Sequence, residues 1–319
     1  MTSLKNLGST GIEIHPLNLG GNVFGWTADR DTSFAVLDAY TEAGGNFVDT
    51  ADAYSRWVPG HTGGESETII GEWLAARRNR DKVVVATKGG RHPDSTGLKP
   101  ETITKAIDAS LRRLGTDYID LYYTHYDDES VEIGEIVTAL DGLVKAGKAR
   151  AVAASNISPE RLSAALDFAK KNDLTSYVAL QPQYNLVSRD TYEGDLKAVA
   201  ERNGLAVFPY YGLAAGFLTG KYRPGASGDV DTGRTVGSLS PSKYLSEERG
   251  PKVLAALDEV ARARDAEIAT VALAWLAAQP TVTGPIASAR AVGQLPALLK
   301  AVELRLSDED LAKLDAASV

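Results

Sequence analysis

The sequence predicts one domain, residues 1–319, folded as a (β/α)8 TIM barrel with an N-terminal β-hairpin and an extra C-terminal helix. Three observations support this fold class. Short apolar runs alternate with helical segments along the chain, and the links between them are short and contain glycine. The rival fold is an open doubly wound sheet, but Gly20-Gly21-Asn22 after the first run is not the dinucleotide-binding glycine turn of that fold. The barrel is therefore preferred.

The elements follow in order. Turn glycines between apolar residues in 4–14 predict a small hairpin lid. Eight β-type runs are expected as strands: 17–20, 46–50, 83–88, 119–124, 149–154, 177–181, 205–210 and 282–286. Segments with helical periodicity lie between and after them: 31–44, 65–78, 100–114, 131–146, 159–172, 190–203, 250–264, 267–279, 291–302 and a last one after Ser307.

Helix-start chemistry is expected at Asp31-Thr32-Ser33 and at Ser158-Pro159-Glu160. Gly115 and Gly147 stand where helices must end. Residues 211–249 interrupt the alternation with Gly, Ser, Pro and Tyr. A long irregular stretch in a compact domain usually binds or covers something, so a functional loop is expected there.

Composition excludes several functions. The 44% hydrophobic content suits a packed core, and no apolar run is long enough to span a bilayer. Without a leader, a soluble cytoplasmic protein is expected. The absence of Cys excludes disulfides and thiolate metal sites, and the four His lack zinc-binding spacing, so no metal is expected. A net charge of −8 without a basic cluster argues against nucleic acid.

Ionisable residues end three consecutive strands. Asp49, Lys88 and His125 each follow a β-branched or aromatic run, and Tyr54 lies five residues after Asp49. Each has an ordinary explanation, such as a turn cap, a solvated strand end or a packed aromatic. Together they are harder to dismiss, because barrel active sites lie at the C-terminal ends of the strands. The sequence thus predicts that these four side chains share one site.

Their chemistry fits proton transfer to a reduced carbonyl. A free tyrosine has a pKa of about 10, and a nearby ammonium favours the phenolate and lowers that pKa. Asp49 would hold Lys88 charged, and a neutral His125 would donate a hydrogen bond to the substrate oxygen. Tyr54 would then protonate the developing alkoxide. This is carbonyl reduction without a metal.

Several strings in the sequence resemble those of the aldo-keto reductase superfamily, over essentially the whole length. They are Asp-Thr-Ala-Asp-x-Tyr (49–54), Gly-Glu-Ser-Glu-x-x-Ile-Gly (64–71), Thr-Lys (87–88), Leu-Gly-Thr-Asp-Tyr-Ile-Asp-Leu-Tyr-Tyr-x-His (114–125) and Ala-Ser-Asn (154–156). The chain is most similar to the bacterial branch that also resembles potassium-channel β-subunits. The resemblance implies Asp49, Tyr54, Lys88 and His125 as the catalytic tetrad and a nicotinamide cofactor across the barrel mouth.

The resemblance also implies cofactor contacts. Ser155, Asn156 and Gln181 would bind the nicotinamide carboxamide, and Tyr210 would stack on the ring. Asp49 is also an expected cofactor contact, and Gly21, Asn22 and Val23 are expected near the ribose. A pyrophosphate loop is expected to contribute Tyr211, Gly212, Leu213, Ala214, Gly216 and Lys221. The expected contacts at the adenosine end are Ser288, Arg290 and Gln294. Arg290 suits a 2′-phosphate, so NADP(H) is favoured over NAD(H).

The chain departs from the family pattern in places. Tyr211-Gly212 replaces Ser-Pro, and Leu298 replaces an Asn that contacts adenine. An extra segment, Ser55–Gly63, would overhang the substrate. The expected substrate-pocket residues are Phe24, Trp26, Tyr54, Trp57, His125 and Tyr126, with Tyr244 as a further wall.

The expected substrate is a small-molecule carbonyl compound: an aldehyde, ketone or oxo-sugar. Two other functions stay open. The channel-subunit resemblance suggests a nucleotide-sensing regulatory subunit with little turnover, and Lys88 in a barrel suggests a Schiff-base lyase. The substrate and the oligomeric state are left open, with a homo-oligomer among the options.

Overall fold

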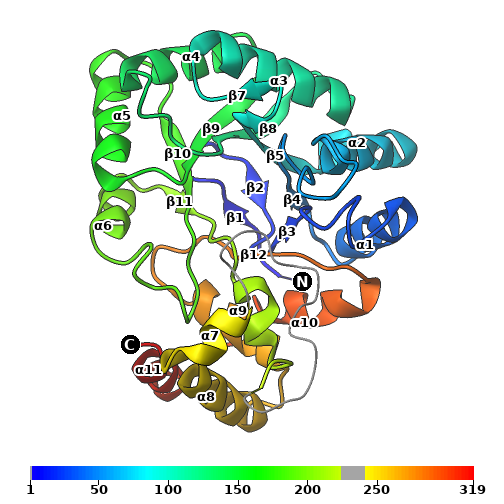
Figure 1. Cartoon of the computed structure of the whole chain (residues 1–319), viewed down its shortest axis with the longest axis vertical. Coiled ribbons are helices and arrows are strands. Elements are labelled where there is room, and N and C mark those ends of the chain that lie inside the picture. The colour runs from blue at the N-terminus through cyan, green and yellow to red at the C-terminus, as the bar shows by residue number, and fades with distance from the viewer. Residues whose placement is uncertain (1, 224–240) are drawn as a thin grey trace.

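The computed structural model describes residues 2–223 and 241–319, and its centre is a barrel of eight parallel strands. They are β3 (Asn18–Gly20), β4 (Phe47–Asp49), β5 (Val84–Gly89), β8 (Ile119–Thr124), β9 (Ala149–Ser155), β10 (Tyr177–Gln181), β11 (Ala206–Val207) and β12 (Ile286–Ala287). From β3 to β11 each strand pairs with the next, and β12 pairs with β3. A parallel bridge between Val207 and Val282 joins the two ends of the sheet. The predicted barrel is confirmed (Figure 1).

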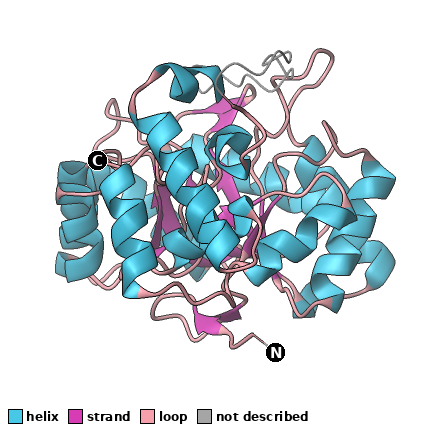
Figure 2. Ribbon diagram, turned by 90° about the horizontal axis from the view of Figure 1, so that it is seen from below, coloured by secondary structure: helices cyan, strands magenta, loops and turns pink. Residues whose placement is uncertain are grey.

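Helices surround the strands on the outside (Figures 1 and 2). The α-helices are α1 (Arg30–Glu42), α2 (Glu65–Arg77), α3 (Pro100–Leu114), α4 (Ile133–Lys145), α5 (Pro159–Lys171), α6 (Asp195–Arg202), α7 (Pro241–Ser246), α8 (Arg249–Ala263), α9 (Ile268–Ala277), α10 (Leu295–Lys300) and α11 (Asp308–Ala317). Short 3-10 helices are η1 (Arg80–Lys82), η2 (Ala214–Thr219) and η3 (Val292–Gln294). The extra C-terminal helix that the sequence predicts is α11.

The N-terminal hairpin closes one end of the barrel. Its strands are β1 (Lys5–Asn6) and β2 (Glu13–Ile14), which pair antiparallel. Leu7 and Ile14 pack in the same buried cluster as Phe47 and Val84, which begin β4 and β5. The hairpin therefore covers the N-terminal ends of the strands, and it projects from one end of the molecule in Figure 2. The C-terminal ends are left for the site.

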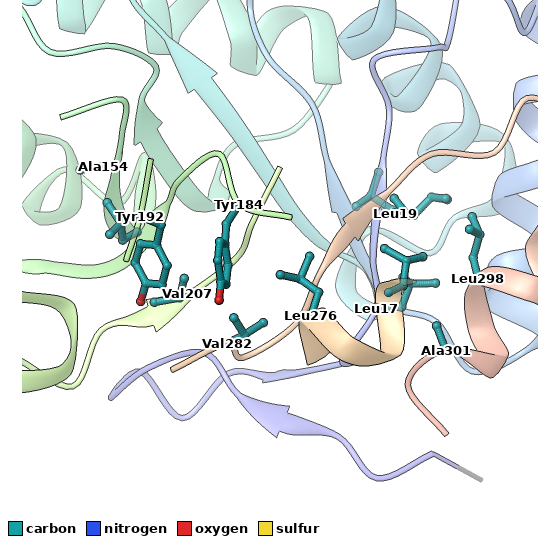
Figure 3. Packing of buried hydrophobic residues seen from close by; sticks show 14 of the residues in the cluster. Leu17, Leu19, Ala154, Tyr184, Tyr192, Val207, Leu276, Val282, Leu298 and Ala301 are labelled. Atoms are coloured by element: carbon teal, nitrogen blue, oxygen red, sulfur yellow. The ribbon is translucent and has the colours of Figure 1, made fainter. Parts of the chain in front are cut away.

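Two apolar layers form the core. Inside the barrel, Leu121 and Tyr123 of β8 pack with Phe208, whereas Tyr122 between them faces the helices. This alternation follows from the two-residue period of a strand. In the outer layer, Leu298 and Ala301 lie beside Leu17 and Leu19 (Figure 3). The α10 region therefore packs against β3, the first strand of the barrel.

Three predicted boundaries are wrong. The eighth strand, expected at 282–286, is β12 at Ile286–Ala287. The N-cap of α1 is Asp29, whose carboxylate accepts the Thr32 N–H at 2.9 Å, while Asp31 lies within the first turn. Helix α6 begins at Asp195 rather than at 190, because Gly194 adopts a φ of 102° that no helix continues through. Ser158 is an N-cap as predicted, since it accepts the Arg161 N–H.

Short elements occur where the sequence predicts loops. The stretch 211–249 contains η2 and α7, and its residues 224–240 lie outside the described part. A second small hairpin, β6 (Arg91–His92) with β7 (Ser95–Thr96), follows β5. The sequence around β6 and β7 has no alternating apolar run that would predict a strand there.

Candidate active site

A buried ion pair lies at the C-terminal end of the barrel. The Lys88 Nζ donates to Asp49 Oδ1 at 2.5 Å and to the Thr50 carbonyl at 2.6 Å. The side chains are 1% and 4% exposed. Burial lowers the pKa of Lys88, and the charge of Asp49 opposes that shift. Because Asp49 and the Thr50 carbonyl both accept hydrogen bonds from the Lys88 amine, this lysine is poorly placed to attack a carbonyl as a Schiff-base nucleophile.

Tyr54 and His125 complete the predicted group of four. The Lys88 Nζ lies 4.8 Å from the centroid of the Tyr54 ring, and the Tyr54 and His125 rings are 5.9 Å apart. Burial, then the charges of Lys88, Arg91 and Arg56, hold the pKa of His125 well below its ordinary value. A neutral imidazole follows from this shift. Among the described residues, its buried Nδ1 has no hydrogen-bond partner.

The pKa of Tyr54 differs from the expectation. A nearby Lys88 is expected to lower this pKa, but burial and the charge of Asp49 raise it well above its ordinary value. Desolvation penalises the phenolate more than the neighbouring ammonium stabilises it. Tyr54 therefore keeps its proton in the free protein, as a donor must before negative charge develops beside it.

Four residues that the sequence assigns to the nicotinamide are linked to this group by hydrogen bonds. Gln181 Nε2 donates to Asp49 Oδ2 at 3.0 Å, and Ser155 Oγ donates to the Gln181 carbonyl at 2.8 Å. Asn156 Nδ2 donates to the His125 carbonyl at 2.8 Å, and the Tyr210 hydroxyl donates to Asn156 Oδ1 at 2.7 Å. The ends of β4, β8, β9, β10 and β11 therefore share one polar network.

A hollow of about 260 Å³ adjoins this network. Its lining includes Asn156 and Tyr210 together with Pro182, Gln183 and Leu196. Polar and aromatic groups thus border open space at the rim of the barrel, as a bound ring would require.

The ends of the first and last strands also meet. Ser288 Oγ donates to Asn22 Oδ1 at 2.5 Å across 266 residues of sequence. A Cβ at Gly20 would lie 2.5 Å from that Ser288 oxygen, so only glycine leaves room there. Gly21 donates its N–H to the Asp49 carbonyl at 2.7 Å, which ties this corner to the ion pair. The adjacent Val23 is buried.

Arg290 and Gln294 lie together beyond β12. The Arg290 N–H donates to Gln294 Oε1 at 2.8 Å, and Gln294 is exposed. Within residues 2–223 and 241–319 the Arg290 guanidinium takes part in no ion pair. Leu298, at the position of the family's Asn, is 4% exposed and belongs to the core, so it offers no polar contact.

The segment 211–221 has an unusual backbone. Tyr211, Ala214 and Ala215 have φ values of 56°, 48° and 55°, and Gly216 follows at 92°. Leu213 has a φ of −104° and a ψ of 16°, so Leu213 and Ala214 form a right-handed residue followed by a left-handed one. Such a pair turns neighbouring N–H groups to one side, an arrangement that can bind an anion. Gly212 and Ala214 are buried, Leu213 is half-buried, and Lys221 is exposed at the end of the segment.

Aromatic side chains border the group of four. The Trp57 ring lies 5.5 Å from Tyr54 and 5.6 Å from Trp26, and Tyr126 lies 5.4 Å from His125. The Trp57 Nε1 is buried without a partner in the described part of the chain. The segment Ser55–Gly63 thus brings Trp57 over the site, as predicted for an overhanging segment.

Two of the expected pocket walls, Phe24 and Tyr244, are buried in this structure. Phe24 is 0% exposed and belongs to the hydrophobic core. Tyr244 is 3% exposed, and its ring packs 5.3 Å from that of Phe217. The sequence does not reveal whether an aromatic ring near a loop faces the core or the pocket, because both sides of such a segment can be apolar.

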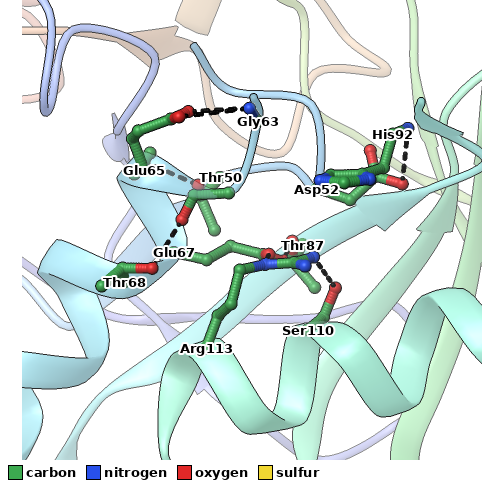
Figure 4. Close-up of polar contacts among 12 residues, drawn as sticks. Thr50, Asp52, Gly63, Glu65, Glu67, Thr68, Thr87, His92, Ser110 and Arg113 are labelled. Atoms are coloured by element: carbon green, nitrogen blue, oxygen red, sulfur yellow. Dashed lines mark hydrogen bonds and ion pairs between the residues drawn. The ribbon is translucent and has the colours of Figure 1, made fainter. Parts of the chain in front are cut away.

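Sequence reasoning missed two carboxylates that position the site (Figure 4). Glu65 accepts the N–H groups of Ser55 at 3.0 Å, of Thr62 at 2.8 Å and of Gly63 at 3.0 Å. One side chain therefore holds both ends of the Ser55–Gly63 segment. Glu65 belongs to the string 64–71. The sequence feature that could have predicted this role is an acidic residue two positions after the Ser55–Gly63 segment.

Asp52 is the second positioning carboxylate. Its Oδ2 accepts the N–H groups of Gly90, Arg91 and His92 at 3.0, 3.2 and 3.1 Å. Burial, then the charge of Glu67, raise the pKa of Asp52 to about 7. Asp52 thus fixes the β6–β7 hairpin to the segment that carries Tyr54.

Glu67, Thr87 and Arg113 form a polar group next to these two carboxylates in Figure 4. Glu67 is 0% exposed, accepts the Thr87 hydroxyl at 2.5 Å and pairs with Arg113 Nε at 2.6 Å. Arg113 also contacts Ser110 (Figure 4). These three residues join α2, β5 and α3. Thr87 and Arg113 donate hydrogen bonds to the buried Glu67 carboxylate, which offsets the cost of removing its charge from water.

Comparison with known proteins shows the family of this chain. The model of the aldo/keto reductase family matches residues 16–319, and the chain belongs to that family. It is 34% identical to the uncharacterized oxidoreductase YrpG of Bacillus subtilis, covering 97% of this chain and 94% of that protein.

Two fungal relatives have named activities. The aryl-alcohol dehydrogenase [NADP(+)] of Phanerodontia chrysosporium is 33% identical, over 96% of this chain and 83% of that protein. Norsolorinic acid reductase B of Aspergillus parasiticus is 32% identical, over 95% of this chain and 81% of that protein. The protein is thus an oxidoreductase whose relatives support carbonyl reduction. No helix in residues 2–223 or 241–319 has the length and apolarity to cross a membrane.

Proposed function

We propose that the protein is an NADPH-dependent reductase that converts an aldehyde, ketone or oxo-sugar carbonyl to an alcohol. The observation that carries this proposal is the Asp49–Lys88 pair beneath Tyr54, with neutral His125 beside it. The aromatic border around them, and the name of the aryl-alcohol dehydrogenase relative, favour an aromatic carbonyl compound.

The residues at the mouth fit a nicotinamide cofactor. The amides of Asn156 and Gln181 and the Ser155 hydroxyl match a carboxamide, and Tyr210 offers a ring beside a hollow. The backbone of 211–216 suits a pyrophosphate, and Lys221 adds a cation. Arg290, with Gln294, Ser288 and Asn22 nearby in the site, would hold the adenosine end. A guanidinium without an ion pair in the described residues suits a 2′-phosphate, which favours NADP(H).

When bound, the cofactor supplies a hydride to the carbonyl carbon. His125 would donate a hydrogen bond to the carbonyl oxygen, because its pKa keeps it neutral. Tyr54 would transfer its proton to that oxygen as negative charge develops. Lys88, held by Asp49, stabilises the phenolate that Tyr54 then becomes.

The test is a Tyr54→Phe variant measured by steady-state NADPH oxidation with benzaldehyde. Loss of a positioned general acid is expected to reduce kcat about 100-fold or more. Fluorescence titration should show NADPH binding retained. Tyr118→Phe is the matched control, because that ring is held under Arg80 at the opposite end of β8.

A rate unchanged in Tyr54→Phe would refute the role of Tyr54. Absence of turnover by the wild type across a panel of aldehydes, ketones and oxo-sugars, with NADPH bound, would instead favour the nucleotide-sensing function.

A further inference from the structure

A row of rings over the site ends on a guanidinium. Trp26, Trp57, Tyr54, His125 and Tyr126 follow one another at centroid distances of 5.6, 5.5, 5.9 and 5.4 Å. Beyond the last ring, the Arg91 Cζ lies 4.4 Å from the Tyr126 centroid. The Tyr126 side is the accessible one, since that residue is 44% exposed. The row thus leads from the proton donor to a cation at the edge.

Arg91 has no carboxylate partner in the described residues. Most buried or half-buried guanidinium groups in this chain form ion pairs, as Arg80, Arg113 and Arg161 do. Arg91 makes no ion pair and no side-chain hydrogen bond within residues 2–223 and 241–319, although it is half-buried. A half-buried guanidinium whose N–H donors have no partner among the described residues is a candidate for binding an anion.

Three carboxylates around the Arg91 hairpin have other partners. Asp52 accepts three backbone N–H groups, and Asp94 lies 3.9 Å from the His92 ring. Asp128 accepts the Leu98 N–H at 3.0 Å and the Ser130 hydroxyl at 2.5 Å. Arg56, exposed and within the Ser55–Gly63 segment, adds a second cation, and its charge also reaches His125. Arg91 and Arg56 thus bring two cations to this region in a chain of net charge −8.

We propose that Arg91 forms an anion subsite, and that the substrate is an aromatic aldehyde or ketone bearing a carboxylate or similar anionic group. This inference rests on the proposed reductase function and names its substrate class. The substrate ring would lie along the aromatic row, with its carbonyl between Tyr54 and His125 and its anion toward Arg91.

The geometry of the stack favours this role. A guanidinium lying over a ring presents its face to the ring and leaves its in-plane N–H donors free for a carboxylate. The Arg91 backbone is fixed by Asp52 at 3.2 Å and by pairing with Thr96 in the hairpin. The cation is therefore held in place before a ligand arrives, which reduces the entropic cost of binding.

The experiment compares two substrates that differ in one charge. The full-length protein is assayed with NADPH and either para-carboxybenzaldehyde or its methyl ester. The quantity measured is the ratio of kcat/KM for the acid to that for the ester. Arg91→Gln is expected to lower this ratio about tenfold or more, chiefly through KM, because a charged hydrogen bond is lost. Raising the salt concentration should lower the wild-type ratio in the same direction.

Arg112→Gln is the matched control, since Arg112 is an exposed arginine on α3 that makes no ion pair in the described residues. It should leave the ratio unchanged. An equal ratio in the wild type and Arg91→Gln would overturn the anion subsite, and so would a wild type that prefers the ester. Either result with Tyr54-dependent turnover intact would leave the reductase function standing. Failure to reduce either aldehyde would instead count against the reductase function itself.

Discussion

At the scale of single residues, the Asp49–Lys88 pair is the most consequential contact. Both side chains are almost fully buried, and Gln181 shares Asp49. Removing one partner leaves an unpaired buried charge, which usually costs more than the pair itself contributes.

Lys88→Met is therefore expected to lose activity and also about 3 kcal/mol of unfolding free energy. Urea unfolding measures the second effect. The double variant Asp49→Asn/Lys88→Met should recover part of that stability without recovering turnover. A double variant less stable than Lys88→Met would contradict the account of an uncompensated carboxylate.

Asp52 should make stability depend on pH. Its folded pKa of about 7 lies above the unfolded value, so the folded state binds more protons between the two values. The stability that Asp52 contributes is present at low pH and is lost as pH rises through its folded pKa.

Asp52→Asn removes that titration but keeps an acceptor for the hairpin. The Tm of the variant minus the Tm of the wild type should increase from about pH 5 to about pH 8. Asp94→Asn, a change at an exposed carboxylate of the same hairpin, should show no such trend. A difference that is constant with pH would show that Asp52 does not titrate in this window.

At the scale of elements, the Ser55–Gly63 segment depends on Glu65. Burial raises the pKa of Glu65, but the N–H donors of Thr62, Ser55 and Gly63 outweigh it and lower the pKa overall. The clamp is therefore fully present above the ordinary carboxyl pKa and weakens as pH falls through the lowered value.

Glu65→Ala should loosen this segment without unfolding the barrel. Trypsin is expected to cleave the variant faster after the exposed Arg56, and KM should rise more than kcat falls, since Trp57 loses its position. Glu72→Ala, on the exposed side of the same helix, is the control. Equal cleavage rates at Arg56 in both variants would refute the clamp.

Pattern predicted β5, β8, β9 and β10 and most of the helices, because these elements keep their period over a long enough stretch. It could not predict β6 and β7, whose strands have two residues each, nor the start of α6, which depends on one glycine conformation. The burial of Phe24 and Tyr244 also escaped prediction, since facing a pocket or the core depends on packing across distant segments.

At the scale of the whole molecule, barrel closure assembles the site. Parallel strands place all their C-terminal ends on one rim, so Asp49, Lys88 and His125 could be grouped from the sequence. The contact between Ser288 and Asn22 needs the last strand beside the first. The upward shift of the Tyr54 pKa could not be predicted from the sequence, because it depends on how the folded chain encloses the ring and excludes water. No spacing of residues reveals that.

The central claim is hydride transfer to a substrate carbonyl at this rim, and isotope transfer tests it most directly. The protein is incubated with para-carboxybenzaldehyde and NADPH carrying deuterium at the transferable position, and the alcohol is analysed by mass spectrometry. The account predicts one deuterium on the former carbonyl carbon of the alcohol. An alcohol without deuterium, or no alcohol from any carbonyl compound in the panel, would contradict it.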